Sequence, residues 1–203
     1  DIPLKPLVDD ALHAEGHPVE RVVVLQRAQP TPPLNPNRDI SWHEFLAGAA
    51  THSGAYVPME ANEPAFILAT SGTTAKPKLA VHRHGGYQVH IVSMGRWCFG
   101  MRPNDVWWAT SDIGWIVGHS YMVYAPLLIG CTSVVFEGAL DFPKPDSVWR
   151  AVVEEIGATG IFTSPTAIRA LMRYGDDPLS SIDHARVERM FSAGEVLNPP
   201  AWD

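Results

Sequence analysis

The residues best suited to chemistry lie in one short stretch, Thr70 to Lys78, which reads Thr-Ser-Gly-Thr-Thr-Ala-Lys-Pro-Lys. It combines four hydroxyl side chains, one flexible glycine and two lysines. Polyphosphate oxygens require such a set of hydroxyl donors, backbone N–H groups and ammonium groups. The stretch therefore predicts a loop that holds the phosphates of a nucleotide.

This loop is not a Walker A motif, which needs a glycine directly before its lysine and a Ser or Thr directly after it. Here Ala75 precedes Lys76 and Pro77 follows it. On composition alone, a solvated Ser/Thr-rich turn between two strands explains the stretch about as well as a phosphate site does. Both interpretations remain open from the loop residues by themselves.

Two other groups of polar residues carry weaker signals. His82, His84 and His90 are close in sequence, but none has a carboxylate or cysteine at metal-ligand spacing, so we interpret them as ordinary surface histidines and predict no metal site. The neighbours His119 and Ser120 lack the GxSxG elbow of a hydrolase, and adjacent residues on a helix do not face one another. The loop is the stronger candidate.

The elements around the loop alternate between strand and helix. The apolar run at 65–69 directly before the loop predicts a buried strand. Further strands are expected at 106–109, 132–136, 160–163 and 187–192, and helices at 86–99, 120–129, 146–156 and 166–174. This order predicts a layered α/β fold: a mostly parallel sheet with flanking helices and ligand sites at the carboxyl ends of its strands.

The first 50 residues predict a smaller set of elements. We expect a helix at 4–15, a strand at 21–25 and a proline-rich surface loop at 28–39. Ser41 then caps a helix that runs to Ala50, with Glu44 completing a capping box. For 203 residues, one compact domain is the simplest expectation.

The composition limits the classes of binding partner that are expected. The formal net charge of -7 and the scattered Lys and Arg residues argue against a nucleic-acid or anionic-membrane surface. Cys98 and Cys131 suggest neither a disulfide framework nor a zinc site, which fits a reducing cytoplasm. The uncharged stretch at 113–136 is interrupted by glycines and a proline, so we predict core elements there and not a membrane span. Small-molecule partners are expected.

Taken together, the loop and its neighbours resemble the central part of AMP-forming acetyl- and propionyl-CoA synthetases, which are acid–thiol ligases of the adenylate-forming superfamily. The resemblance runs from about Lys5 to Trp202 with matching order and spacing. Besides the loop, the matching residues are His82, Gly85-Gly86-Tyr87, Trp108, Asp112, Gly114-Trp115, Gly118-His119-Ser120-Tyr121, Phe136-Glu137-Gly138, Pro165-Thr166-Ala167-Ile168-Arg169-Ala170-Leu171 and Gly194-Glu195.

The resemblance implies a two-step reaction. ATP and a small carboxylate such as acetate or propionate give an acyl-adenylate and pyrophosphate, and the thiol of CoA then displaces AMP. Negative charge builds on the departing pyrophosphate, so donors, lysines and Mg²⁺ are implied to stabilise it. By this resemblance the phosphate-loop residues are Thr70, Ser71, Gly72, Thr73, Thr74 and Lys76.

The resemblance also implies an acid pocket. Trp115, Ile116 and Val117 are implied to form its wall, with Ala193 on the facing side and His119 as a wall of the acid or CoA channel. Acetate-specific relatives tend to carry a larger valine in place of Ala193, which favours propionate or a similar acid. One methylene is worth only about 1 to 3 kcal/mol in such a pocket, so the selectivity is expected to be modest. Simple core packing is the alternative role for Trp115.

The nucleotide and CoA contacts follow in the same way. Gly194, Glu195 and Val196 match the segment that lies against the adenine and the rest of the nucleotide. Val117 and Asp141 match positions where relatives contact CoA. Arg169 is left open by the sequence, either as a solvated cation or as an internal ion-pair partner.

The sequence departs from the family pattern at four positions. Ala75 and Leu79 stand where glycine is usual, and a positive φ at Ala75 would cost about 1 kcal/mol. Val196 stands where proline is usual. Val117 replaces a threonine that touches CoA in relatives, which puts that polar contact in doubt.

We expect residues 1–203 to be an internal part of a longer chain, covering part of the AMP-binding domain. The first residue is not Met, and Asn198-Pro199 has the pattern of a helix start shortly before Asp203. The resemblance puts a Mg²⁺-binding glutamate, a ribose-binding aspartate and the lysine of a C-terminal lid domain beyond Asp203. Two alternatives remain: an adenylation domain that loads a carrier protein, and a non-catalytic nucleotide-binding module.

Overall fold

The computed structural model describes residues 4–13, 19–27, 30–70, 77–175 and 177–201. It divides into two compact units, Asp1–Val57 and Pro58–Asp203, where the sequence favoured one. The boundary falls within residues 52–63, which form neither helix nor strand. A linker without regular structure leaves each unit to form its own internal contacts, which explains the difference from the expected single domain.

The first unit contains helix α1 (Leu4–Leu12), strands β1 (Val22–Val24) and β2 (Asp39–Ser41), helix α2 (Trp42–Gly48) and a 3₁₀ turn at Ala49–Thr51. The two strands pair in parallel. The predicted capping box is confirmed: Ser41 Oγ accepts from the Glu44 N–H at 3.2 Å, and Glu44 Oε2 accepts from the Ser41 N–H at 3.1 Å. The predicted loop ends one residue early, because Asp39 begins β2.

An ionic network holds α1 against β2. Lys5 Nζ lies 2.7 Å from Asp9 Oδ1 and 2.7 Å from Asp39 Oδ2, and Arg38 pairs with both carboxylates. The Asp39 side chain is fully buried, and the hydrogen bond from Arg38 holds the pKa of its carboxyl well below the usual value. A buried carboxylate keeps its charge only beside such partners. The network therefore ties the helix to the sheet.

The second unit carries the elements around the candidate site. In chain order they are β3 (Pro64–Thr70), β4 (Lys78–Arg83), α3 (His84–Ser93), β5 (Val106–Ala109), α4 (Ala125–Ile129), β6 (Thr132–Val134), α5 (Pro145–Trp149), β7 (Gly160–Thr163), α6 (Pro165–Met172), α7 (Asp177–Ser180) and β8 (Arg189–Ser192). Three π-helical segments lie at Met94–Cys98, Gly118–Tyr124 and Arg150–Glu155, and a 3₁₀ turn lies at Pro199–Ala201.

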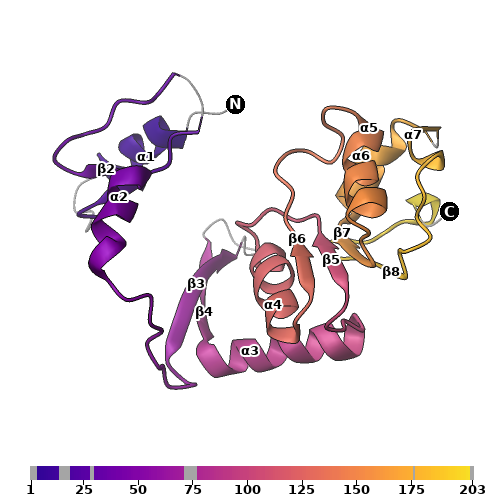
Figure 1. The fold of residues 1–203 in the computed structure, drawn as a ribbon, viewed down its shortest axis with the longest axis horizontal. Coiled ribbons are helices and arrows are strands. Elements are labelled where there is room, and N and C mark those ends of the chain that lie inside the picture. The colour runs from indigo at the N-terminus through magenta and orange to yellow at the C-terminus, as the bar shows by residue number, and fades with distance from the viewer. Residues whose placement is uncertain (1–3, 14–18, 28–29, 71–76, 176, 202–203) are drawn as a thin grey trace. The chain divides into compact units, whose positions relative to one another are not determined.

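Four of these strands form the predicted parallel sheet, in the order β6, β5, β7, β8 (Figure 1). Successive side chains on a strand point to opposite faces of the sheet. Trp107 on β5 therefore belongs to one hydrophobic cluster, and its neighbour Trp108 to another. The prediction of a sheet covered on both faces is confirmed.

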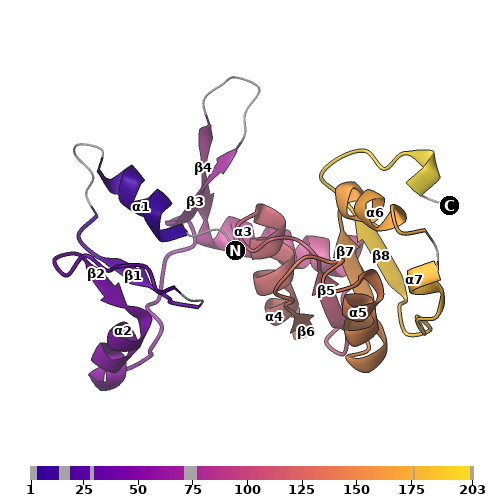
Figure 2. The same ribbon diagram turned by 90° about the horizontal axis from the view of Figure 1, so that it is seen from above.

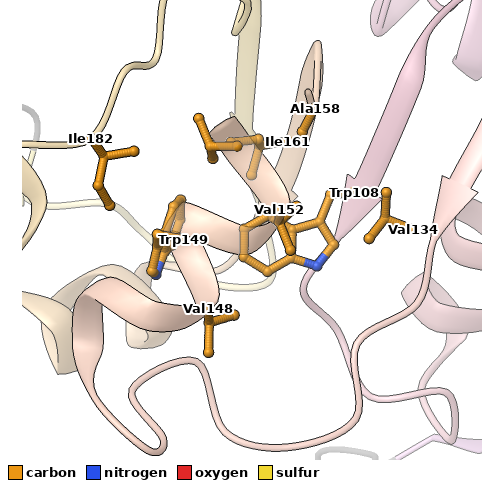
Figure 3. Packing of buried hydrophobic residues seen from close by; sticks show 9 residues of the cluster. Trp108, Val134, Val148, Trp149, Val152, Ala158, Ile161 and Ile182 are labelled. Atoms are coloured by element: carbon orange, nitrogen blue, oxygen red, sulfur yellow. The ribbon is translucent and has the colours of Figure 1, made fainter. Parts of the chain in front are cut away.

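The cluster around Trp108 forms the core beneath α5. Figure 3 shows the indole of Trp108 between Val134 and Val152. Its ring lies edge-on to that of Trp149, with centroids 4.9 Å apart. Trp108 is completely buried, so this face of β5 is anchored by the largest side chain available.

The opposite face packs around Trp107. Its cluster includes Met101, Met122, Ile129 and Phe162. The buried indole keeps its polar atom satisfied, because Trp107 Nε1 donates to the carbonyl oxygen of Tyr121 at 2.8 Å. This contact fixes the π-helical segment Gly118–Tyr124 against the sheet.

The strand before the phosphate loop differs from its prediction. Strand β3 is present, but it pairs antiparallel with β4 and does not join the parallel sheet (Figure 2). It is also not fully buried: Phe66 and Leu68 are half-buried, whereas Ile67 is 58% exposed. A pair of strands buries one face of an apolar run and leaves the other open, which explains the error. Strand β4 was not predicted, because the polar residues Lys78, His82 and Arg83 obscure its apolar pattern.

The helices lie where they were predicted, but three of them are partly π-helical. The helices expected at 86–99, 120–129 and 146–156 each contain one of the π-helical segments. A single inserted residue in a helix produces such a turn, and hydrophobic periodicity does not reveal it. The strands expected at 132–136 and 187–192 are shorter, at Thr132–Val134 and Arg189–Ser192.

Candidate functional site

The carboxyl ends of β5, β7 and β8 meet at one edge of the parallel sheet. Two hydrogen bonds join the segments that leave this edge. The hydroxyl groups of Thr110 and Thr163 lie 2.8 Å apart, and the Ala193 N–H donates to the Thr163 carbonyl oxygen at 3.3 Å. Thr163, at the end of the middle strand, therefore contacts the start of both segments predicted to carry site residues.

The segment after β5 forms a turn held at several points. Asp112 Oδ1 accepts from the Gly114 N–H at 2.7 Å, and the Asp112 carbonyl accepts from the Trp115 N–H at 3.1 Å. The Trp115 carbonyl in turn lies 2.8 Å from Nδ1 of His119. The Trp115 side chain is 67% exposed, so in the described structure its role is not core packing. A fixed backbone presents an exposed aromatic ring at this edge.

Gly118 makes that turn possible. A Cβ atom at this position would lie 2.3 Å from the Asp112 carbonyl oxygen and 2.7 Å from Cα of Ile113. Both contacts are with backbone atoms that cannot move aside, so only glycine allows the helix to start this close to the turn.

A cleft of about 460 Å³ lies beside this turn. Ile116 and Val117, two of the three residues predicted as the acid wall, line it, whereas Trp115, His119 and Ala193 do not. Inside it the Tyr87 hydroxyl lies 2.8 Å from Ser120 Oγ, and burial raises the pKa of Tyr87. The full lining is Val81, His82, Arg83, Gly86, Tyr87, His90, Ile116, Val117, Ser120 and Tyr121. A mostly apolar cleft with a few hydroxyl groups suits a small organic ligand.

Stacked rings connect the turn to the strand that leads into the phosphate loop. The ring of Phe66 on β3 stacks on that of His82 with centroids 4.7 Å apart, and lies 6.0 Å from the near-parallel ring of His119. Tyr87 meets Phe66 edge-on at 4.8 Å. The three histidines interpreted as surface residues from the sequence therefore differ: His82 belongs to this stack and lines the cleft, and His90 also lines the cleft.

The phosphate loop itself is described only at its ends. Thr70 ends β3 and pairs with Lys78 at the start of β4, where Thr70 Oγ1 donates to the Lys78 carbonyl oxygen at 3.3 Å. This pairing brings the two ends of the loop together. Ser71, Gly72, Thr73, Thr74 and Lys76 lie outside the described residues, and their predicted role rests on the sequence.

The segment after β8 is bent at Gly194, whose φ of 102° favours glycine. The Glu195 carboxylate accepts from the Thr166 N–H at 3.1 Å and also contacts the Thr166 hydroxyl and the Arg169 guanidinium. The hydrogen bond from Thr166, followed by the contact with Arg169, lowers the pKa of Glu195. Arg169, left open by the sequence, is an ion-pair partner. Val196 is 84% exposed.

The second residue predicted to contact CoA, Asp141, is not one of the residues that line the cleft. Its carboxylate accepts from the Tyr174 hydroxyl at 2.9 Å, and Arg173 lies 3.9 Å away. The hydrogen bond to Asp141 raises the pKa of Tyr174. The structure therefore gives Asp141 partners on the segment after α6 and does not bring it together with Val117.

Two kinds of feature are absent from the described ranges. Among these residues no three His, Cys, Asp or Glu side chains lie together as a possible metal site. Within the same ranges no helix has the length and apolar character needed to cross a bilayer.

Sequence reasoning missed several residues that shape the site. Phe66, Tyr87, Thr110, Thr163 and Thr166 each make contacts described above. Tyr87 and Thr166 lie inside matched motifs, so a signal for them was present. Phe66, Thr110 and Thr163 lie in or just after strands, where their contacts depend on which strands are neighbours.

A parallel α/β sheet with an apolar cleft and loops at its carboxyl edge defines a class of proteins that bind small ligands at that edge. Within it, the chain belongs to the family of AMP-binding enzymes, whose family model matches residues 5–203.

Individual relatives agree with this assignment. The chain is 45% identical over 204 residues to an acetyl-coenzyme A synthetase of Pyrobaculum aerophilum, covering 98% of this chain and 30% of that protein. It is 41% identical to an acetyl-coenzyme A synthetase of Phycomyces blakesleeanus, covering 100% and 30%. An acetoacetyl-CoA synthetase structure from Streptomyces lividans matches with a TM-score of 0.71 and 27% identity, over 90% of this chain and 27% of that one. The chain thus spans about 30% of the length of the curated relatives.

Proposed function

We propose that the chain is part of a short-chain acyl-CoA synthetase that activates a small carboxylate with ATP and transfers the acyl group to CoA. The carrying observation is the shared carboxyl edge: Thr163 hydrogen-bonds both to Thr110, before the acid-wall turn, and to Ala193, before the nucleotide segment. An acyl-adenylate joins an acyl group to a nucleotide, so it needs both kinds of contact at one place. The names of the relatives, acetyl-coenzyme A and acetoacetyl-CoA synthetases, support this choice.

In the first step a carboxylate oxygen of the acid attacks the α-phosphorus of ATP, and the bond to the β-phosphate oxygen breaks to release pyrophosphate. The loop from Thr70 to Lys76 would donate hydrogen bonds and positive charge to that leaving group as its negative charge grows. In the second step the CoA thiol attacks the acyl carbon and AMP leaves with the electron pair of the broken C–O bond. The turn and the loop would orient the reacting groups, as transfer of a group between two bound molecules requires.

Mg²⁺ commonly supports such a reaction by neutralising phosphate charge. The described residues present no set of three ligands for it, so we assign it no residue of this chain and no step.

The acid is proposed to be propionate or a similar short acid. Ile116 and Val117 line the apolar cleft, and Ala193 is a small residue on the segment expected to face them. We also propose a cytoplasmic location, which agrees with two free thiols at Cys98 and Cys131.

A carrier protein as the acyl acceptor is the nearest alternative, and a non-catalytic nucleotide-binding module is a second. The relatives named for CoA products favour CoA. Titration of CoA into the chain with an acyl-adenylate analogue already bound would separate the two acceptors, because only a CoA-dependent enzyme should bind both together.

The phosphate loop is tested by replacing Lys76 with alanine and measuring ATP binding to the chain by calorimetry. We expect about a tenfold or greater loss of affinity, because a charge-assisted hydrogen bond is worth about 1.5–3 kcal/mol. Lys144→Ala removes the same charge from an exposed position before α5 and serves as the matched control. Equal ATP affinity of the Lys76 variant and the unmodified chain would refute the phosphate role.

Residues 1–203 by themselves are expected to form no acyl-CoA, because the resemblance implies that a lid lysine outside them is required. Incubation with ATP, CoA and acetate or propionate checks this. Formation of acyl-CoA by the isolated chain would show that the residues needed for catalysis all lie within it.

A further inference from the structure

The carboxylate of Glu195 is already occupied by the protein. Its Oε1 accepts from the Thr166 backbone N–H at 3.1 Å and contacts the Thr166 hydroxyl, while its Oε2 pairs with Arg169. A carboxylate with both oxygens engaged has little capacity left for a ligand. Near the phosphates of a nucleotide its negative charge would also be repulsive without a cation beside it. Glu195 is therefore better placed to hold the segment than to touch a nucleotide.

Arg169 also contacts the same segment at Asn198. Its Nη1 donates to Oδ1 of Asn198 at 3.3 Å, and its Nη2 also lies 3.4 Å from Thr166 Oγ1. One guanidinium on α6 thus reaches residues on both sides of Val196. The guanidinium of arginine carries its donors on three nitrogens in a fixed planar fork, whereas the three donors of lysine all lie on one nitrogen at the end of a flexible stem.

Val196, between these two contacts, carries the most exposed large hydrophobic side chain of the segment after β8, at 84%. Gly194 bends the chain just before it with a φ of 102°. An exposed apolar side chain on a backbone fixed at both ends provides a flat surface for a ring. A purine base is the apolar, planar part of the proposed ligand.

We propose that Arg169 is a positioning residue for nucleotide binding: it fixes Glu195 and Asn198 so that Val196 packs against the purine ring. This inference rests on the proposed function, since it names the residue that holds the nucleotide segment of that same site. It differs from a purely structural role, in which the ion pair would only stabilise the start of α6. Fixing a loop before binding improves affinity by removing the cost of ordering it.

The test compares Arg169→Met with Arg173→Met, which removes the same charge one turn further along, near Asp141 and away from the Glu195 segment. The probe is a non-hydrolysable acyl-adenylate analogue, an acylsulfamoyl adenosine, titrated by calorimetry. We expect Arg169→Met to weaken binding about tenfold, Arg169→Lys to recover it only partly, and Arg173→Met to leave it unchanged. Amide hydrogen exchange at 194–198 should speed up in Arg169→Met alone.

A second variant distinguishes a specific loss of binding from misfolding. Glu195→Gln keeps the shape of the side chain and removes only its charge, so it should weaken binding in the same direction while the circular dichroism spectrum stays that of the unmodified chain. If the unmodified chain binds the analogue and Arg169→Met binds it equally well, the positioning role is refuted and the proposed function stands. If the unmodified chain does not bind the analogue, the proposed function and this inference both fail.

Discussion

At the scale of single residues, Gly118 shows how one atom decides the geometry of the turn at Asp112 to Trp115. Its Cα lies so near the backbone of Asp112 that a Cβ atom would be 2.3 Å from that carbonyl oxygen. The π-helical segment Gly118–Tyr124 starts at this contact. The position of Ile116 and Val117 in the cleft depends on it.

We therefore predict that Gly118→Ala destabilises the chain by about 1–3 kcal/mol, the usual cost of forcing an atom into a packed site. Gly86→Ala is the control, since a Cβ on Gly86 meets no atom within 4 Å and helix propensity should make this change neutral or stabilising. Urea unfolding followed by circular dichroism measures both. Equal stability of the two variants would contradict the contact.

The two cysteines should differ sharply in reactivity. Burial raises the pKa of the Cys131 thiol to about 11 from an ordinary 9.0, whereas Cys98 is exposed. The neutral thiol is favoured in the fold, so this contribution to stability is complete below about pH 9 and is lost as the pH rises through about 11. At pH 8 a thiol reagent should label Cys98 alone, and Cys98→Ser should abolish fast labelling. Rapid labelling of two thiols in the folded chain would contradict this.

Local patterns could be predicted at this scale, and long-range partners could not. Ser41 and Glu44 are three residues apart, so the sequence alone was enough to predict their capping box. Arg169 and Glu195 are 26 residues apart, and no periodicity connects them. Their pairing depends on β7 and β8 being neighbours in the sheet.

At the scale of elements, the stability of the sheet depends on Trp108 of β5. Its indole is completely buried between Val134 and Val152 and meets Trp149 (Figure 3). Trp108→Ala should cost about 3–5 kcal/mol, because it leaves a cavity that the parallel sheet cannot close.

Trp97→Ala is the matched control for that substitution. Trp97 is 83% exposed, so its loss should change stability by less than about 0.5 kcal/mol. Far-ultraviolet circular dichroism is the appropriate measurement, since removing a tryptophan alters fluorescence directly. A Trp108 variant as stable as the Trp97 variant would overturn the packing described here.

Elements were predictable where both of their faces are buried. The strands at Val106–Ala109 and Gly160–Thr163 match their predictions, because runs of apolar or small residues bounded by turns leave little choice. The hairpin was not predictable in the same way. Strand β3 has one open face, and β4 is too polar to be recognised without its partner.

At the scale of the whole molecule, each unit has its own source of stability. Among the described residues, every buried hydrophobic side chain belongs to the second unit, Pro58–Asp203. In Asp1–Val57 the ionic network of Lys5, Asp9, Arg38 and Asp39 therefore takes the place of a large apolar core. The stability of this unit should therefore depend on the charges of these residues, and so on pH.

We predict that β1 and β2 lose protection as the pH falls below about 4. The pKa values of Asp9 and Asp39 are lowered from 3.8 by hydrogen bonds from Lys5 and Arg38, so their contribution is complete above that value and lost as the pH falls through the lowered ones. Asp39→Asn should reproduce the loss at pH 7, and Asp10→Asn, an exposed carboxylate on α1, should not. Protection factors of the Val22 to Val24 amides, corrected for the intrinsic pH dependence of exchange, that stay constant down to about pH 2 would contradict the network.

The division into two units was not predictable from length, because 203 residues suffice for one good core or two small ones. What the sequence did carry was the family. The motifs from Thr70 to Glu195 indicated a family that the comparisons confirm, while the contacts through Thr163 required the fold.

The most direct test of the central claim compares three ligands of the unmodified chain in one calorimetric series: propionate, AMP and the non-hydrolysable propionyl-adenylate analogue. If the acid wall and the nucleotide segment form one site at the carboxyl edge, the analogue should bind one to one and at least about a hundredfold more tightly than AMP, because linking two bound groups removes the cost of holding them separately. An analogue that binds no better than AMP would show that these two segments do not form a common site.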